Sequence, residues 1–113
     1  MTSKSSIIIR RKTMPKRVGE PIHPGEILAE ELEFMGINGV ELATKIDVPK
    51  NRIYQIVNGE RSITADTALR LGKFFGTGPR IWLKLQIAYD LDVASKQMGN
   101  VLNDIFTYEH QLT

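Results

Sequence analysis

Polar side chains that are able to read nucleic-acid bases are concentrated directly after Pro49. They are Lys50, Asn51, Arg52, Tyr54 and Gln55. Lysine donates hydrogen bonds to the edge of guanine, and the amide of Asn or Gln pairs with adenine through two hydrogen bonds. The tyrosine is suited to a thymine methyl group or to a phosphate. By themselves these residue types favour an ordinary solvated helix face, and contact with DNA is the alternative interpretation.

The next segment carries groups that are suited to phosphate rather than to bases. They are Asn58, Arg61 and Ser62. Arginine is always charged and can hold a phosphate through two hydrogen bonds. Contacts of this kind fix the register of a protein on DNA without reading its sequence. For Asn58, a simple role as a helix cap is the equal alternative.

No group of residues has the types and spacing of an enzyme or a metal site. The chain has no cysteine, which excludes a disulfide, a thiolate zinc site and a thiol nucleophile. The two histidines, His23 and His110, lie far apart without a spaced acidic partner, so a capping or solvated role suits them better. No phosphate-cradling glycine loop and no serine–histidine–acid arrangement occurs. We expect no catalytic residue, no metal, no cofactor and no enzymatic activity.

The elements that must position the polar residues are predicted to be helices. Apolar residues recur at three- and four-residue steps, and Pro, Asn, Thr and Gly stand where helices begin and end. The predicted ranges are about 24–35, 38–46, 49–57, 64–75 and 79 to an end between 91 and 95. A short sixth helix is an option within 96–113. No strand pattern appears after residue 20, so the sequence predicts an all-α domain of about five helices.

Residues 40–59 have the spacing of a helix-turn-helix, in which a turn of three or four residues joins two short helices. Ala43 is small enough for the second helix to approach, and the β-branched Ile53 fills the angle between the two helices. Asp47 stands in the turn where glycine is usual, because the backbone there adopts a positive φ. Aspartate enters that region more easily than bulkier residues. We therefore predict the motif with a positive φ at residue 47.

The chain is long enough for one domain with extensions at its ends. We predict a flexible basic extension over 1–20, a DNA-binding domain over 21–95 and a C-terminal extension, with some helical spacing, over 96–113. No apolar run approaches the roughly 18 residues that a membrane span needs. Together with the lack of cysteine, this favours the cytoplasm.

The net charge of +2 hides a separation of charge along the chain. Residues 1–17 carry six basic and no acidic residues, 24–46 carry one basic and five acidic residues, and 49–80 carry six basic and two acidic residues. Segregated charge of this kind indicates that one surface meets a polyanion and another does not.

Seven stretches of the chain together resemble the HigA/VapI family of antidotes within the broad Xre-like, lambda-repressor-like class. They are HPGEIL at 23–28, ELA at 41–43, VP at 48–49, RI at 52–53, IVNGERSITADTALRL at 56–71, FFGTG at 74–78 and WLKLQIAYDL at 82–91. The resemblance covers about 22–92 and implies a lambda-repressor-like five-helix bundle. It also implies a homodimer that binds double-stranded operator DNA, represses its own operon and neutralises a cognate toxin, typically an mRNA-cleaving enzyme. The resemblance makes contact with DNA the expected role of the polar side chains that follow Pro49. Gly39 departs from related repressors, which often carry a Gln there braced against phosphate, so we expect that contact to be absent.

The resemblance also suggests a dimer interface in the last helix, with Trp82, Leu85 and Tyr89 as its anchors. Packing of these residues inside their own domain is the equal alternative. Two rival functions remain open at this point: a stand-alone Xre-type repressor without a toxin, and a protein-interaction module in which the helix-turn-helix is only a scaffold.

Overall fold

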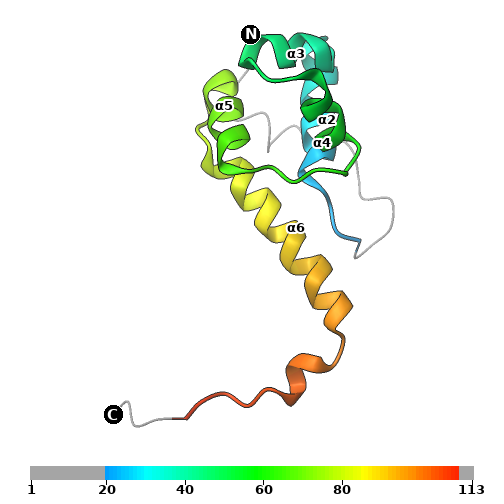
Figure 1. The fold of residues 1–113 in the computed structure, drawn as a ribbon, viewed down its shortest axis with the longest axis vertical. Coiled ribbons are helices and arrows are strands. Elements are labelled where there is room, and N and C mark those ends of the chain that lie inside the picture. The colour runs from blue at the N-terminus through cyan, green and yellow to red at the C-terminus, as the bar shows by residue number, and fades with distance from the viewer. Residues whose placement is uncertain (1–19, 110–113) are drawn as a thin grey trace.

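The computed structural model describes residues 20–109, in which helices alone form the regular structure (Figure 1). The elements are α2 (Pro24–Met35), α3 (Gly39–Ile46), α4 (Lys50–Val57), α5 (Ala65–Phe75), α6 (Arg80–Met98) and the 3-10 helix η1 (Val101–Asp104). The predicted all-α fold with five helices is confirmed, and the helix expected over 24–35 has those bounds. The extension predicted for 1–20 lies outside the described residues except for its last residue, and His110 also lies outside them.

Side chains close the first turns of α2 and α3. The imidazole Nδ1 of His23 accepts a hydrogen bond of 2.8 Å from the backbone N–H of Gly25, so this histidine caps α2. At α3, the side chain of Asn38 accepts from the backbone N–H of Glu41 at 2.9 Å, and Glu41 accepts from the N–H of Asn38 at 3.0 Å. This reciprocal capping box satisfies two N–H groups that a helix start leaves unpaired. Thr64 precedes α5 as predicted, but its side chain makes no capping hydrogen bond.

The turn between α3 and α4 has the backbone that the sequence predicts. Asp47 adopts φ 60° and ψ 55°, and it is the only residue other than glycine with a positive φ in the described range. The N–H of Val48 bonds to the carbonyl of Ala43 at 3.0 Å, and the N–H of Asp47 bonds to that of Thr44 at 3.3 Å. Two carbonyls at the end of α3 are satisfied in this way, as in the usual left-handed helix end.

The core lies where α2, α3, α4 and α5 meet the start of α6. Its fully buried apolar side chains are Leu28, Leu42, Ile53, Ile56, Ala68, Leu71 and Trp82. Helices α2 and α4 approach closely because Gly25 has no side chain: a Cβ there would lie 1.8 Å from the backbone oxygen of Ile56. Glu31 of α2 is buried as well, although it is a charged residue.

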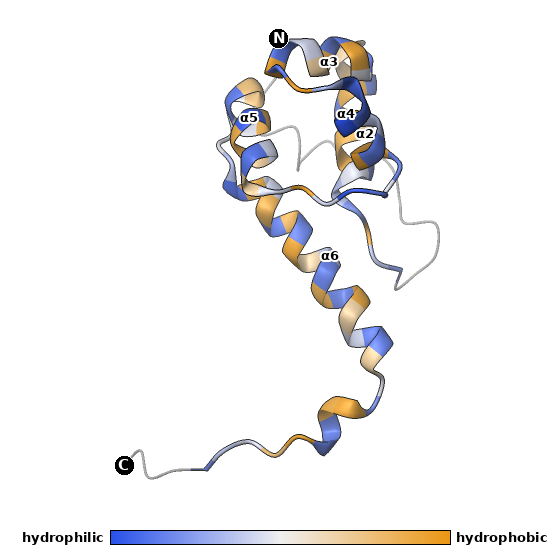
Figure 2. Cartoon of the chain, in the orientation of Figure 1, coloured by the Kyte–Doolittle hydropathy of each residue, from blue (hydrophilic) through white to orange (hydrophobic). Residues whose placement is uncertain are grey.

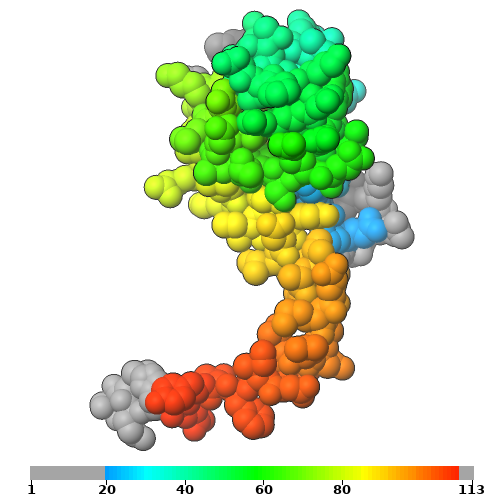
Figure 3. All heavy atoms as spheres, in the orientation of Figure 1, coloured from blue at the N-terminus to red at the C-terminus, as the bar shows by residue number. Residues whose placement is uncertain are grey.

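Helix α6 leaves the packed part of the molecule and extends away from it with η1 beyond (Figures 1 and 3). Its two buried residues, Trp82 and Gln86, lie in its first two turns. The helix continues to Met98, past the end predicted between 91 and 95, because no helix-breaking residue occurs before Gly99. Apolar residues nevertheless continue along the extended part (Figure 2). At 19 residues α6 is the longest helix, and neither it nor another helix within 20–109 has the length and apolar character to cross a membrane.

Candidate nucleic-acid interface

Helix α4 has two faces with different environments. Ile53 and Ile56 are completely buried against the core, whereas Lys50 and Asn51 are exposed at the first turn. Tyr54 is 40% exposed. The apolar side of α4 thus faces the core, and its polar first turn faces outward. An eight-residue helix with its N-terminal turn free can enter a DNA major groove with these side chains leading.

The ring of Tyr54 packs across the first turn of α3, next to Gly39. A Cβ on Gly39 would lie 2.9 Å from the Cζ atom and 3.1 Å from the Cε1 atom of this ring. The space in which a side chain at residue 39 would lie is thus occupied by the tyrosine. Gly39, which departs from related repressors, thus leaves room for the ring of Tyr54 from α4.

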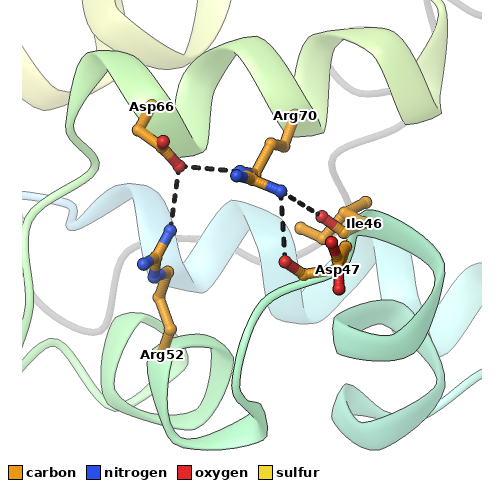
Figure 4. Close-up of polar contacts among 5 residues, drawn as sticks. All are labelled: Ile46, Asp47, Arg52, Asp66 and Arg70. Atoms are coloured by element: carbon orange, nitrogen blue, oxygen red, sulfur yellow. Dashed lines mark hydrogen bonds and ion pairs between the residues drawn. The ribbon is translucent and has the colours of Figure 1, made fainter.

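An ion pair holds the side chain of Arg52 against the surface of the protein. Its Nη1 atom lies 2.9 Å from the Oδ1 atom of Asp66 at the start of α5, and its side chain is 26% exposed. Figure 4 shows Asp66 between Arg52 and a second arginine, Arg70. Arg52 thereby joins α4 to α5, and its predicted contact with DNA remains a prediction.

Arg70 is a residue of this region that the sequence analysis did not single out. Its Nε atom donates to Asp66 at 2.7 Å, and its Nη1 atom donates to the carbonyls of Ile46 and Asp47 at 2.8 and 3.1 Å (Figure 4). The guanidinium therefore satisfies carbonyls at the turn between α3 and α4. Its hydrogen bond, together with the charge of both arginines, lowers the pKa of the Asp66 carboxyl. The four-residue spacing of Asp66 and Arg70 was a usable signal for the ion pair, but no local pattern points to the carbonyls.

The loop after α4 makes a direct contact with the helix it follows. The Nε atom of Arg61 donates a 2.9 Å hydrogen bond to the Oε1 atom of Gln55. Asn58, at the C-cap of α4, and Ser62 are both exposed, as is Arg61. The predicted phosphate-binding residues thus border the outer face of α4, and the C-cap position of Asn58 agrees with its capping alternative.

Gln86 of α6 holds this loop through a hydrogen bond to its backbone. Its Oε1 atom accepts a 2.7 Å hydrogen bond from the backbone N–H of Ile63, and its Nε2 atom donates to Asp90 at 2.9 Å. Both Gln86 and Ile63 are buried. Sequence reasoning missed Gln86, because a lone glutamine within an apolar helical stripe carries no signal of the distant N–H that it satisfies.

His23, at the start of α2, packs against α6. It is buried, and its ring meets that of Tyr89 edge-on with centroids 4.8 Å apart. Burial lowers the pKa of His23 below 6.5, although nearby Glu26 and Asp90 act in the opposite direction. Among residues 20–109 no three histidine, cysteine or acidic side chains gather as a metal site. His23 caps α2, because its Nδ1 atom accepts from the N–H of Gly25.

The three residues predicted for a dimer interface all point toward their own domain. Trp82 is completely buried and packs against Phe75, with ring centroids 5.7 Å apart, so it offers no surface to a second copy and is corrected to a core residue. Leu85 is half-buried against the core, and Tyr89 contacts His23. The outer face of α6 instead exposes Ile87 and Leu91. A helical stripe seen in sequence does not reveal which of two apolar faces the domain covers.

Comparisons with known proteins show relatives of the same fold. A profile described as "Helix-turn-helix" matches residues 28–82. Virulence-associated protein I of Dichelobacter nodosus is 48% identical over 89 residues, which are 76% of this chain and 82% of that protein. An addiction module antidote protein of a HigA family from Coxiella burnetii superposes with a TM-score of 0.76 at 54% identity, covering 79% of this chain and 99% of that one. Antitoxin HigA of Pseudomonas aeruginosa, in a structure with the higBA promoter, gives a TM-score of 0.76 at 37% identity, covering 80% and 100%.

Proposed function

Because the chain belongs to the HigA/VapI family of Xre-like helix-turn-helix antidotes, we propose that it binds operator DNA of its own operon and represses transcription from it. The observation that carries the proposal is the division of α4, whose isoleucines are buried while Lys50 and Asn51 face outward. The structure of a relative with its promoter supports the same use of the fold. Membership of this family also confirms the expectation that the chain is not an enzyme.

DNA binding is tested by titrating the protein against the duplex upstream of its own gene, with fluorescence anisotropy as the readout. Lys50→Ala and Gln55→Ala each remove a side chain from the outer face of α4. Each is expected to weaken binding by about 1–3 kcal/mol and to relax the preference at one base position. Lys96→Ala is the matched control, because it removes the same charge from the far end of α6, where Lys96 pairs with Asp92.

Two results would contradict this assignment of α4. One is unchanged operator binding by both α4 variants. The other is wild-type protein that binds no duplex at any salt concentration, which would favour the protein-interaction module. A DNA-binding protein of this kind loses affinity steeply as salt rises, because cations are released from the phosphates it covers.

We further propose that the protein is the antidote to a cognate toxin, an mRNA-cleaving enzyme, in the cytoplasm. The antidote and antitoxin names of its relatives support this proposal. Expression of the product of the adjacent reading frame should arrest growth, co-expression of this chain should restore it, and the two proteins should copurify. If the adjacent product neither arrests growth nor copurifies, the function is that of a stand-alone repressor, as relatives known only as HTH-type transcriptional regulators suggest.

A further inference from the structure

The hydrogen bond between Arg61 and Gln55 joins a loop residue to a residue of the recognition helix. The Nε atom of Arg61 donates to the Oε1 atom of Gln55 at 2.9 Å. A guanidinium has five N–H donors and no acceptor, so only the oxygen end of the amide can face it. The bond therefore fixes which end of the amide is oxygen and which is nitrogen. An unbraced glutamine amide turns over freely and presents either end.

The loop that carries Arg61 is held on several sides. The N–H of Glu60 bonds to the carbonyl of Gln55 at 2.8 Å, and the N–H of Gly59 bonds to that of Ile56 at 3.0 Å. On the other side of Arg61, Ile63 is buried and its N–H bonds to Gln86. The backbone of Arg61 is thus fixed relative to α4, so the Cα atom from which its side chain extends has a defined position.

Arg61 has further N–H donors besides the one that bonds to Gln55. Its Nε–H is used, which leaves the four N–H groups of its two Nη atoms, and the residue as a whole is exposed. Two parallel N–H donors match the geometry of a phosphate. The same guanidinium can therefore hold the DNA backbone and the base-reading amide together.

Resting on the proposed DNA binding, we propose that Arg61 is a positioning residue for base recognition and not only a phosphate contact. While its Nη groups hold a phosphate, its Nε–H keeps the Gln55 amide turned so that Nε2 donates to N7 of an adenine. The second lone pair of Oε1 then accepts from the N6 amino group of that adenine. Preference for an A·T pair at this position thus depends on a residue outside the recognition helix.

The test compares base preferences rather than affinity alone. Binding is measured for the wild type, Arg61→Ala, Arg61→Lys, Gln55→Ala and the double alanine variant, on the operator and on duplexes with each base pair changed in turn. The wild type should prefer one A·T pair by about 5- to 100-fold. Gln55→Ala and Arg61→Ala should lose preference at that same pair, and the double variant should lose no more than either single one.

Arg61→Lys separates charge from geometry. A lysine retains the positive charge and so restores much of the affinity, but its single ammonium cannot hold a phosphate and the Gln55 oxygen in the same arrangement. Its preference at the A·T pair should therefore stay lost. Arg80→Ala is the matched control, because it removes an exposed arginine at the start of α6. Circular dichroism melting checks that the variants are folded.

Two outcomes would overturn the proposal while leaving DNA binding intact: Arg61→Ala that weakens all duplexes equally with the wild-type preference retained, or Arg61→Lys that keeps the full preference. Failure of the proposed function looks different, because the wild-type protein itself would then not distinguish its operator from an unrelated duplex.

Discussion

Single side chains hold together the segments that surround the outer face of α4. Arg70 satisfies carbonyls at the turn before α4, and Gln86 satisfies an N–H in the loop after it. Gln86 is buried, and the guanidinium of Arg70 is engaged by Asp66 and by the carbonyls of Ile46 and Asp47. Their positions explain how a turn and a loop without regular structure are kept in place, because a buried backbone group left unpaired costs free energy.

Replacement of Gln86 by leucine should destabilise the protein. Leucine has a similar size but leaves the buried N–H of Ile63 without its acceptor, at a cost of about 1–3 kcal/mol in the free energy of unfolding. Urea denaturation measures the change, with Gln97→Leu, an exposed position on the same helix, as the control. Equal stability of both variants would show that the N–H finds another partner.

His23 should make the stability depend on pH. Its pKa in the folded protein lies below 6.5, the value of an ordinary histidine, because burial disfavours the charged ring. The unfolded chain therefore takes up the proton at a higher pH than the folded one. The contribution is complete above about pH 6.5 and is lost as the pH falls from there through the lowered folded-state pKa.

His23→Asn isolates this effect, because asparagine also caps helices but does not titrate. The melting temperature of the wild type should fall more than that of the variant between neutral pH and about pH 5. Titration of all other groups is common to both proteins and cancels in the comparison. Parallel curves would mean that His23 does not couple protonation to folding.

At the scale of elements, the helices were predictable and their contacts were not. Apolar spacing and capping residues gave α2 through α5 within a residue or two, and the positive φ at Asp47 followed from its place in the motif. These features depend on residues that are neighbours in the sequence. The inward direction of Glu31 and the bond from Arg61 to Gln55 depend on residues brought together only by folding.

The crossing of α2 and α4 should tolerate no side chain at Gly25. An alanine Cβ would lie 1.8 Å from the backbone oxygen of Ile56, so one helix must move, which we expect to cost about 3 kcal/mol. Gly36→Ala at the other end of α2 is the control: nothing lies within 4 Å, and only its left-handed backbone opposes alanine, at about 1 kcal/mol. Thermal melting should rank Gly25→Ala as the more damaging. The reverse order would place the helices farther apart.

The part of the molecule that the structure describes is elongated rather than compact. Its extents are 54 × 33 × 27 Å, because α6 continues beyond the packed helices (Figure 3). The extended part exposes Ile87, Leu91 and Met98 at helical spacing, with Leu91 65% exposed. We expect a second copy to cover this stripe in the homodimer that the family resemblance implies.

Leu91→Lys should shift the protein toward monomer without unfolding it, because the side chain is exposed in the single chain. Sedimentation equilibrium measures the association, and a loss of at least tenfold is expected, since burying an unpaired charge outweighs the lost apolar contact. Lys84→Ala, also exposed on α6, is the control. A monomeric wild type, or an unchanged dimer in Leu91→Lys, would contradict the proposed interface.

The place of Tyr54 over Gly39 has a consequence for attempts to redesign specificity. The tyrosine ring lies in space that a larger residue at 39 would fill. Grafting α4 alone into a relative with glutamine at that position would transfer the sequence of α4 but not the side-chain arrangement, because the glutamine would take the space of the Tyr54 ring. A graft must therefore include the first turn of α3 together with α4.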